Sequence, residues 1–473
     1  MKRTKKVTPE VSAKAEGYIA NGYQRLLTFE VPGGGFSWFG NAPANKILTS
    51  YGLMEFSDMS KVHDVDPKVI DRTQQWLARQ QQANGSWSPD TSFINEGATN
   101  RFNSDIVRIT AYVAWSLEVT GYQGPAVDNA KLFIETRLID TKLGGTAKPD
   151  VYTLAVLANF AVDYAKDPAF TEKVMQLLLD AKTEQGDQVR WNAEETSMYA
   201  TGASAAVETT GLAVQAILKR GSDPAVATKA MNYLVSKKDA LGAWGTTPAT
   251  IMALRALLLS ADKAGGTAKG AVEVVLNDKV AGRLALTSEN NDLLHQFVFK
   301  DVDARSANAV EIRFNGEGSV AYQVAGRYFV PWNEKPANEA LSIDVHYDRT
   351  HLEQDQIATA TATVRNNLTK AAGMVMVDLG IPPGFELLSE DLDAYRQKSA
   401  GQKSGRLEKF SLTATQAILY FDSVAPNGKF ALSFRLRAKY PIRARTFASR
   451  VYEYYAPEVG SLAPPVQLEV RKR

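Results

Sequence analysis

Cysteine is absent from the 473 residues, and histidine occurs only four times. The absence of cysteine excludes disulfides, thiolate metal ligands and a cysteine nucleophile within this chain. The formal net charge is +2, so neither sign is in the excess that nucleic-acid or membrane-surface binding favours. No apolar run reaches transmembrane length. The start, MKRTKKVTPEV, is basic but continues into Pro9 and Glu10 without an apolar core, so no export signal is visible. The composition indicates a soluble globular protein, and the length predicts two or three domains.

A tight turn followed by an aromatic residue recurs through the first part of the chain. It is clearest in QQQANGSW, residues 80–87, and returns in varied form in GGGFSWFG, GDQVRW and GAW, with GGT at 144–146 as an echo without the aromatic ring. The marker positions recur about every 52 residues, and they are Phe36, Trp87, Gly145, Trp191 and Trp244. Two helical patterns lie between successive markers, which is typical of an array of helical hairpins.

Two kinds of helical pattern alternate between these markers. ITAYVAWSL, YTLAVLANF, TTGLAVQAIL and TIMALRALL are apolar nearly all round, whereas their neighbours carry a charged face. The alternation predicts an inner ring of buried helices inside an outer, half-exposed ring, which is an α/α toroid. Phe36, Trp87, Trp191 and Trp244 are then expected to close the hairpins over the core, rather than to bind a cofactor or substrate.

The hydrophobic period changes to two from about residue 283. Runs such as VEIRFNGEG, LSIDVHYD and QAILYFDSV alternate between Gly, Asn and Pro turns, as strands do. PWNEKPANEA reads as a linker, and SEDLDAYRQ as one short helix capped by Ser389, with Glu390 and Asp391 in its first turn. The predicted division is a helical toroid at 1–282, a short β segment at 283–333, a linker at 334–340 and a β-sandwich at 341–473.

Several of these stretches resemble the α2-macroglobulin and complement family. TPEVSAKAEGYIANGYQRLLTFEVPGGGFSWFG, RTQQWLARQQQANGSW and GAWGTTPATIMALRAL are similar to parts of its thioester-containing toroid. NNDLLHQFVF and GEGSVAYQVAGRYFV resemble the second half of its CUB domain. VMVDLGIPPGFELLSEDL and RVYEYY resemble its C-terminal receptor-binding sandwich. The resemblance covers nearly the whole chain in the family's domain order.

The resemblance implies a protease trap or opsonin-like protein without its reactive group. In the family, cleavage of an upstream bait segment swings the toroid, and an internal Cys–Gln thioester then captures the protease. This chain has no cysteine. The resemblance places the thioester motif in the hairpin one period of about 52 residues before Phe36, a position upstream of Met1. Five turn markers stand where the family has six hairpins, so the ring of this chain alone is expected to be open along one seam. We therefore expect the C-terminal part of a longer extracellular or periplasmic endopeptidase inhibitor, which meets proteases through that parent protein and whose ring an upstream polypeptide completes.

Two family positions carry over by resemblance. Asn95, in SFINEGATN, matches the place of a His that acts as a base in family members that esterify hydroxyls, and an amide cannot take that proton. A structural role in its loop is the alternative for Asn95. Where vertebrate members present paired lysines for a receptor, the matching stretch presents acids, so binding to an acidic-cluster receptor is not expected. These acids are Glu386, Glu390, Asp391 and Asp393. A capped, solvated helix is their neutral interpretation.

Two alternatives to the protease trap stay open, a macroglobulin-like module with only an interaction role and a toroid hydrolase. Gln81, Gly85 and Trp87 match the QxxxGxW pattern of terpene cyclases, but that pattern braces hairpins and performs no chemistry. There is no Asp-x-Asp-Asp motif, and a zinc prenyltransferase would need a Cys ligand. A glycosidase would need two carboxylates converging on one mouth of the ring.

Few other toroid residues suggest chemistry. Glu194 and Glu195 adjoin each other on a predicted loop, and Glu208 lies on a predicted helix; structural roles are expected for all three. His63 is the only histidine of the toroid and is expected to cap a helix end rather than to bind a metal. No metal, cofactor, nucleic acid or membrane insertion is expected.

Overall fold

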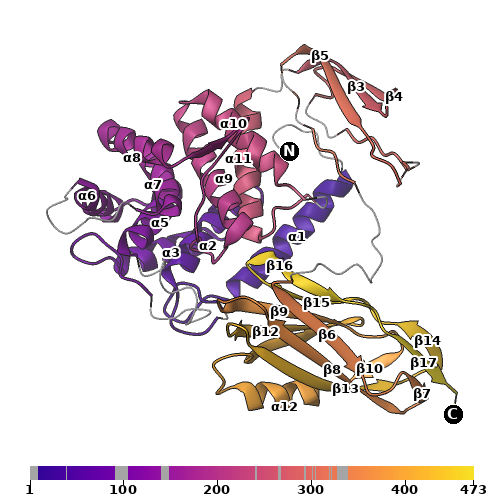
Figure 1. Ribbon diagram of the computed structural model, residues 1–473. Helices are drawn as coiled ribbons and strands as arrows, with labels where there is room; N and C mark the ends of the chain where they lie inside the picture. The colour runs from indigo at the N-terminus through magenta and orange to yellow at the C-terminus, as the bar shows by residue number, and fades with distance from the viewer. Residues whose placement is uncertain are drawn as a thin grey trace.

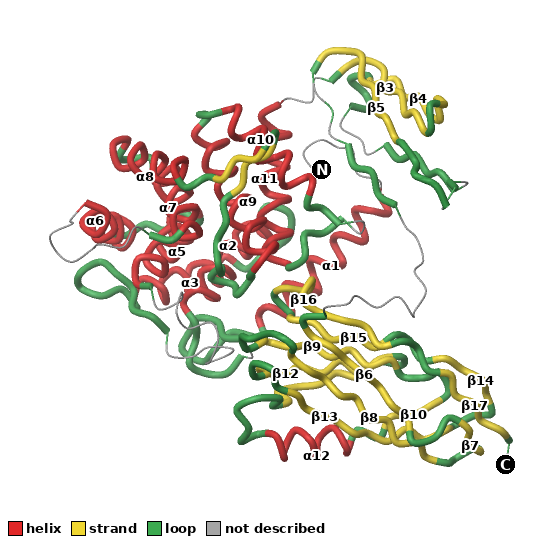
Figure 2. The backbone as a smooth tube through the Cα atoms, viewed as in Figure 1, coloured by secondary structure: helices red, strands yellow, loops and turns green. Residues whose placement is uncertain are grey.

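The structure is a computed structural model, and it describes most of the chain. The described residues are 9–38, 40–90, 105–139, 149–239, 242–264, 268–291, 295–300, 302–303, 305–318, 320, 322–326 and 339–472. Helices fill the first part and strands the second, as the sequence predicts (Figures 1 and 2). Within the described residues, no helix is both long and apolar enough to cross a lipid bilayer.

In the part of the chain that the structure describes, the helices form five consecutive hairpins. The first helix of each hairpin is outer and the second inner. The outer helices are α1 (Pro9–Leu27), α3 (Pro67–Arg79), α6 (Ala126–Ile139), α8 (Pro168–Asp180) and α10 (Pro224–Ser236). The inner helices are α2 (Lys46–Ser60), α5 (Ile106–Val119), α7 (Val151–Tyr164), α9 (Gly202–Arg220) and α11 (Thr247–Ala264). Inner helices pack against their neighbours in the order α2, α5, α7, α9, α11 (Figure 1).

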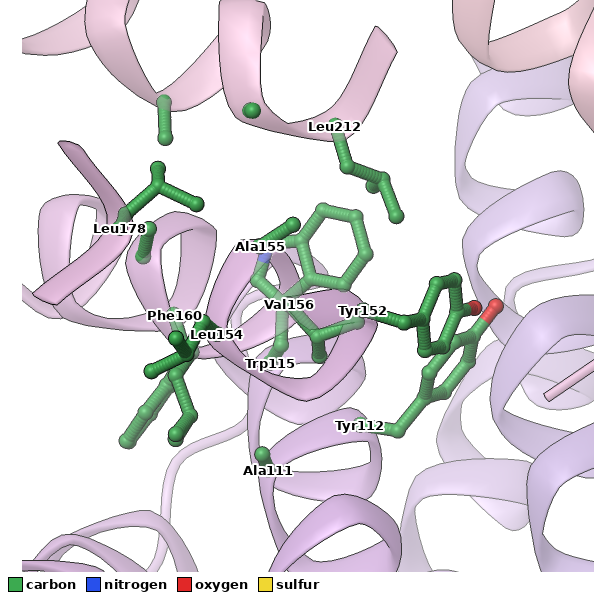
Figure 3. Packing of buried hydrophobic residues seen from close by; sticks show 14 of the residues in the cluster. Ala111, Tyr112, Trp115, Tyr152, Leu154, Ala155, Val156, Phe160, Leu178 and Leu212 are labelled. Atoms are coloured by element: carbon green, nitrogen blue, oxygen red, sulfur yellow. The ribbon is translucent and has the colours of Figure 1, made fainter. Parts of the chain in front are cut away.

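The ring's core lies between the two layers of helices. Helices α5, α7 and α9 are buried around almost their whole circumference, which explains why their sequences lack a polar face. Figure 3 shows part of this core, with Trp115 of α5 packed among Ala155 and Val156 of α7 and Leu212 of α9. Aspartates start several helices by accepting backbone N–H groups of the first turn, as Asp105 does from Val107 and Asp150 from Tyr152.

A short hairpin of β1 (Thr183–Gln185) and β2 (Gln188–Arg190) lies within the helical part, and the strands that follow the helices begin earlier than the sequence indicated. Strand β3 (Lys269–Leu276) pairs with β4 (Lys279–Leu286) and with β5 (Val310–Glu317) in one three-stranded sheet. The predicted boundary between residues 282 and 283 therefore falls inside β4. Asn277 and Asp278 both have positive φ, so they form the tight turn of a β-hairpin. The Asn-Asp pair between two alternating runs is a hairpin signal in the sequence. The predicted division instead assigned the apolar run before this pair to the helical part.

The C-terminal part is a sandwich of two main antiparallel sheets. One sheet has the order β10-β13-β8-β6 and the other β11-β12-β9-β15-β16, while β14-β17-β7 forms a small third sheet. The bounds in chain order are β6 (Leu341–Tyr347), β7 (His351–Glu353), β8 (Ile357–Asn366), β9 (Ala372–Gly380), β10 (Phe385–Leu387), β11 (Leu407–Leu412), β12 (Gln416–Val424), β13 (Lys429–Ala438), β14 (Ile442–Arg445), β15 (Ser449–Glu453), β16 (Ala456–Ala463) and β17 (Gln467–Arg471). The one helix of the sandwich, α12 (Glu390–Ser399), lies where it was predicted, but the side chain of Ser389 makes no capping hydrogen bond. That detail of the prediction was wrong.

Candidate functional site

The three marker tryptophans are bonded to both helices that flank them, and Phe36 is bonded to the following helix. The indole N–H groups of Trp87, Trp191 and Trp244 donate to carbonyls in the last turn of the preceding outer helix, at 2.7, 2.7 and 2.6 Å. The backbone N–H of each marker aromatic donates to a threonine hydroxyl of the following inner helix, including that of Phe36 to Thr49 at 2.8 Å. Because all four side chains are buried, these contacts brace the hairpins and leave no ring face for a substrate.

The glutamine of the QxxxGxW pattern has a similar bracing role. Gln81 donates through its amide to the carbonyl of Gly85 at 3.0 Å and to that of Ala126 at 2.7 Å. Ala126 begins helix α6, so the bond joins one hairpin to the next.

Every inner helix contributes at least one polar side chain to a cluster of groups that affect one another's pKa. Glu55 and Tyr51 lie on α2, Tyr112 on α5, Tyr152 on α7, Glu208 on α9 and Arg255 on α11. The Tyr152 hydroxyl donates to Glu208 Oε1 at 3.2 Å. Figure 3 shows the Tyr112 and Tyr152 hydroxyls pointing toward the same space. Arg255 also forms an ion pair with Asp58, which links α11 to α2.

The two glutamates of this cluster have raised pKa values. Burial raises the pKa of Glu208 to about 7, against the opposing effects of hydrogen bonds from Thr196 and Tyr152 and of the Arg108 charge. Burial also raises the pKa of Glu55 to about 7, against the opposing charge of Arg255. Neither glutamate is among the groups that shift the pKa of the other. Both glutamates nevertheless raise the pKa values of Tyr51 and Tyr112, so the two carboxyls belong to one polar cluster.

Arg108 of α5 is fully buried and joins three segments. Its guanidinium donates to the Asp150 carboxylate at 2.7 Å, to the Thr153 hydroxyl at 3.1 Å and to the carbonyl oxygen of Glu195 at 3.3 Å. It also lies over the Tyr152 ring. Through the Glu195 carbonyl, Arg108 supports the loop at 195–201, which leads into α9.

The loop at 195–201 presents Tyr199 to the sandwich. The ring of Tyr199 lies 5.4 Å from that of Trp38 and 5.6 Å from that of Tyr455, which follows β15. Tyr454 packs edge-on against Tyr455 at 4.9 Å. Strand β16 is the part of the sandwich that reaches the helices in Figure 2. These four aromatic residues form what we call the aromatic junction between the ring and the sandwich.

Polar contacts at the start of α9 complete the aromatic junction. The backbone N–H of Ala203 donates to Glu458 Oε1 and that of Thr201 to the carbonyl oxygen of Tyr455, both at 3.4 Å. Gly202 has a φ of 57°, in the left-handed region that favours glycine, and a Cβ atom there would lie 2.8 Å from Glu458 Oε1.

Both sides of the aromatic junction hold a bulky residue in the left-handed region. Tyr199 has φ 65° on the ring side, and Met374, whose carbonyl accepts from the Tyr454 N–H at 2.8 Å, has φ 46° on the sandwich side. Such conformations cost roughly 1–3 kcal/mol each and tend to gather at functional sites. The strain singles out the aromatic junction as the candidate functional site.

The acidic residues predicted for the surface of the sandwich helix are mostly neutralised. Asp391 pairs with Arg435 at 2.8 Å and Asp393 with Arg396 at 2.9 Å, while Glu386 lies on β10 and pairs with Lys439 at 3.0 Å. Hydrogen bonds from Arg435 and from Lys439 lower the pKa values of Asp391 and Glu386. The stretch therefore alternates in charge instead of forming a continuous acidic patch, and Glu390 is exposed in the first turn of α12.

Two other predicted positions have different outcomes. Asn95 lies outside the described residues, so its role stays a prediction. Asp90, the last described residue before it, binds the start of α2 through the backbone N–H and the ammonium group of Lys46, both at 2.8 Å. His63 follows α2, where its backbone N–H donates to the Met59 carbonyl at 2.8 Å and its ring packs against Tyr23. No group of three or more metal-ligating side chains occurs among the described residues.

The aromatic junction was missed by the sequence analysis. Tyr199 and Tyr455 are more than 250 residues apart, and each lies beside a turn that local patterns describe only as a loop. The run YEYY near the C-terminus is unusually aromatic for a turn, and it was the one local signal available.

Comparisons with known families cover both parts of the chain. Residues 1–259 match the family model described as the A-macroglobulin TED domain. Residues 370–462 match the one described as the A-macroglobulin receptor binding domain.

Individual relatives are distant in sequence and similar in fold. Ovostatin of Gallus gallus is 21% identical over 485 residues, which cover 98% of this chain and 32% of ovostatin. Native α2-macroglobulin of Escherichia coli, in a crystal structure from domain MG7 to the C-terminus, matches with a TM-score of 0.64 at 16% identity, covering 98% of this chain and 68% of that one. Salmonella α2-macroglobulin reacted with methylamine matches with a TM-score of 0.64 at 15% identity, covering 98% and 28%. The chain thus spans about a third of the curated relative that it matches.

Proposed function

The chain belongs to the A-macroglobulin family, and we propose that it is the C-terminal part of a protease-trapping macroglobulin, acting outside the cell or in the periplasm. With no cysteine, these residues hold no thioester of their own. The chain would supply the ring that moves and the sandwich on which the ring docks, while its longer parent protein meets the protease. The observation that carries the proposal is the aromatic junction.

The aromatic junction has the properties of a contact that opens. Its described polar bonds to the sandwich are both 3.4 Å long, and Glu458 and Tyr454 are exposed at its edge. A permanent interface would bury a larger apolar core, with most of its side chains withdrawn from water. A small aromatic contact with strained backbone on each side is weak enough to be lost. The docked and undocked positions of the ring can then have similar free energies. This supports a ring that swings relative to the sandwich.

We also propose that an upstream polypeptide completes the ring. Helices α1 and α11 end the arc of hairpins, and each exposes large apolar side chains. These are Val11 and Tyr18 on α1, and Leu254 and Leu258 on α11, with exposed fractions of 52%, 68%, 43% and 62%. Of the described residues of α1, only Tyr23 is buried, although the helix has 19 residues. Apolar surface gathered at both ends of an arc indicates a site for another helix.

Neither the hydrolase nor the pure interaction module is favoured by a specific observation. Glu208 is fully buried and bonded to Tyr152, and Glu55 lies near Arg255, so the described contacts give each carboxyl a polar partner within the ring. The interaction module remains the result that the following experiment would give if the covalent trap is wrong.

The proposal is tested by the intact mass of the native gene product before and after methylamine treatment. The product is isolated with an antibody to the sandwich. We expect a species much larger than 51.7 kDa that gains one methylamine and frees one thiol. A species near 51.7 kDa without a mass change would refute the covalent trap and leave the interaction module.

A further inference from the structure

Helix α9 begins differently from the inner helices before it in the chain. Helix α2 is capped by the side chain of Asn45, α5 by that of Asp105 and α7 by that of Asp150, each a neighbour in sequence. Thr201 occupies the capping position of α9 in an extended conformation, yet its side chain makes no capping hydrogen bond. Threonine side chains are good helix caps, so the Thr201 hydroxyl can cap α9, although it does not do so in this structure.

A residue of the sandwich takes over that task. A capping side chain normally accepts from the second or third N–H of the helix. In α9 the second of these belongs to Ala203, and it donates to Glu458 Oε1. A carboxylate at a helix N-terminus is also favoured by the helix dipole. The Glu458 carboxylate lies close to Gly202, where a Cβ atom would be 2.8 Å from Oε1.

We infer that the ring and the sandwich exchange a helix cap. Glu458 caps α9 while the sandwich is docked, and the Thr201 hydroxyl replaces it when the sandwich leaves. An uncapped N–H group would otherwise add its own cost to undocking. With the Thr201 hydroxyl as the replacement cap, undocking costs the aromatic stacking and the Thr201 N–H bond to Tyr455 but leaves no uncapped N–H group at Ala203. The exchange therefore makes the aromatic junction easier to open without weakening the docked arrangement.

The inference rests on the proposed function only in supposing that the ring and sandwich separate. It does not depend on protease capture, a thioester or an upstream polypeptide. Its test therefore uses the full 473-residue chain alone, and its failure would leave the test with methylamine unaffected.

The test is amide hydrogen exchange at Ala203 and Ser204 in four proteins: the unchanged chain, Thr201→Val, Glu458→Ala and the double variant. Each single variant keeps one cap, so exchange should rise less than about two-fold. The double variant keeps neither, and exchange should rise about five-fold or more, beyond the product of the single effects. Glu390→Ala and Thr228→Val, which change exposed residues elsewhere, serve as matched controls and should leave these amides unchanged.

Three results would overturn the cap exchange. If Thr201→Val alone gives the full effect, Thr201 already caps the docked helix. If Glu458→Ala alone gives it, Glu458 has no replacement. If the two effects simply multiply, the two side chains act independently and do not substitute for each other. All these positions are at the surface or half-exposed, so the variants are expected to fold, and unchanged exchange deep in α9 verifies that they do.

Discussion

Replacing Glu208 by glutamine should stabilise the ring above neutral pH. Glu208 is buried in α9, and its pKa is raised from an ordinary value of 4.5 to about 7. A carboxyl with a raised pKa holds its proton in the folded state at pH values where the unfolded chain has lost it. The folded ring therefore has its full stability below the unfolded pKa, and loses stability as the pH rises from 4.5 through 7.

The magnitude follows from the two pKa values. At about 1.36 kcal/mol per pH unit, the difference between 4.5 and 7 corresponds to on the order of 3 kcal/mol. Glutamine cannot ionise and keeps an oxygen that accepts from the Tyr152 hydroxyl. Glu208→Gln should thus gain roughly 2–3 kcal/mol relative to the unchanged protein between about pH 5 and about pH 8.

The assay is urea unfolding followed by tryptophan fluorescence at both pH values. Six of the seven tryptophans lie between Trp38 and Trp244, so fluorescence reports on the ring rather than on the sandwich. Glu390→Gln, at an exposed position on α12, is the matched control and should show no such gain. The reasoning fails if the stability difference caused by Glu208→Gln is the same at both pH values, or if it is more unfavourable at the higher pH.

Three further changes test the bracing, the seam and the aromatic junction. Trp191→Phe should destabilise the ring by about 1–3 kcal/mol in urea unfolding, because a buried carbonyl in the last turn of α8 loses its donor. Leu258→Asp should abolish co-purification of an upstream polypeptide, while Leu132→Asp, at a similarly exposed position on α6, should not; loss in both or in neither would contradict the seam. Tyr455→Ala should increase the radius of gyration in small-angle X-ray scattering because the contact with the ring is lost, whereas Tyr440→Ala, at an exposed position of the sandwich, should leave it unchanged.

The repeating part of the molecule was predictable because its causes are local. The inner helices are apolar on every side, and the recurring turn with its aromatic residue gives the hairpin period directly. The pairing of Asp391 with Arg435 was not visible, because 44 residues separate the partners and only the packing of α12 on β13 brings them together. The aromatic junction was hidden for the same reason. Long-range contacts between loops leave no periodic signal in the sequence.

The coupling between the two buried glutamates distinguishes a structural polar cluster from a catalytic pair. In a hydrolase whose carboxyls share a site, the two titrate as a coupled pair, and removing one changes the pKa of the other. Glu55 instead responds to Arg255 and Tyr51, and Glu208 to Thr196 and Tyr152. The effects of Glu55→Gln and Glu208→Gln on unfolding at about pH 8 should therefore add to within about 0.5 kcal/mol in the double variant. A coupling energy well above that would mean that the carboxyls sense each other, and it would revive the toroid hydrolase in place of a ring whose polar centre serves only its own folding.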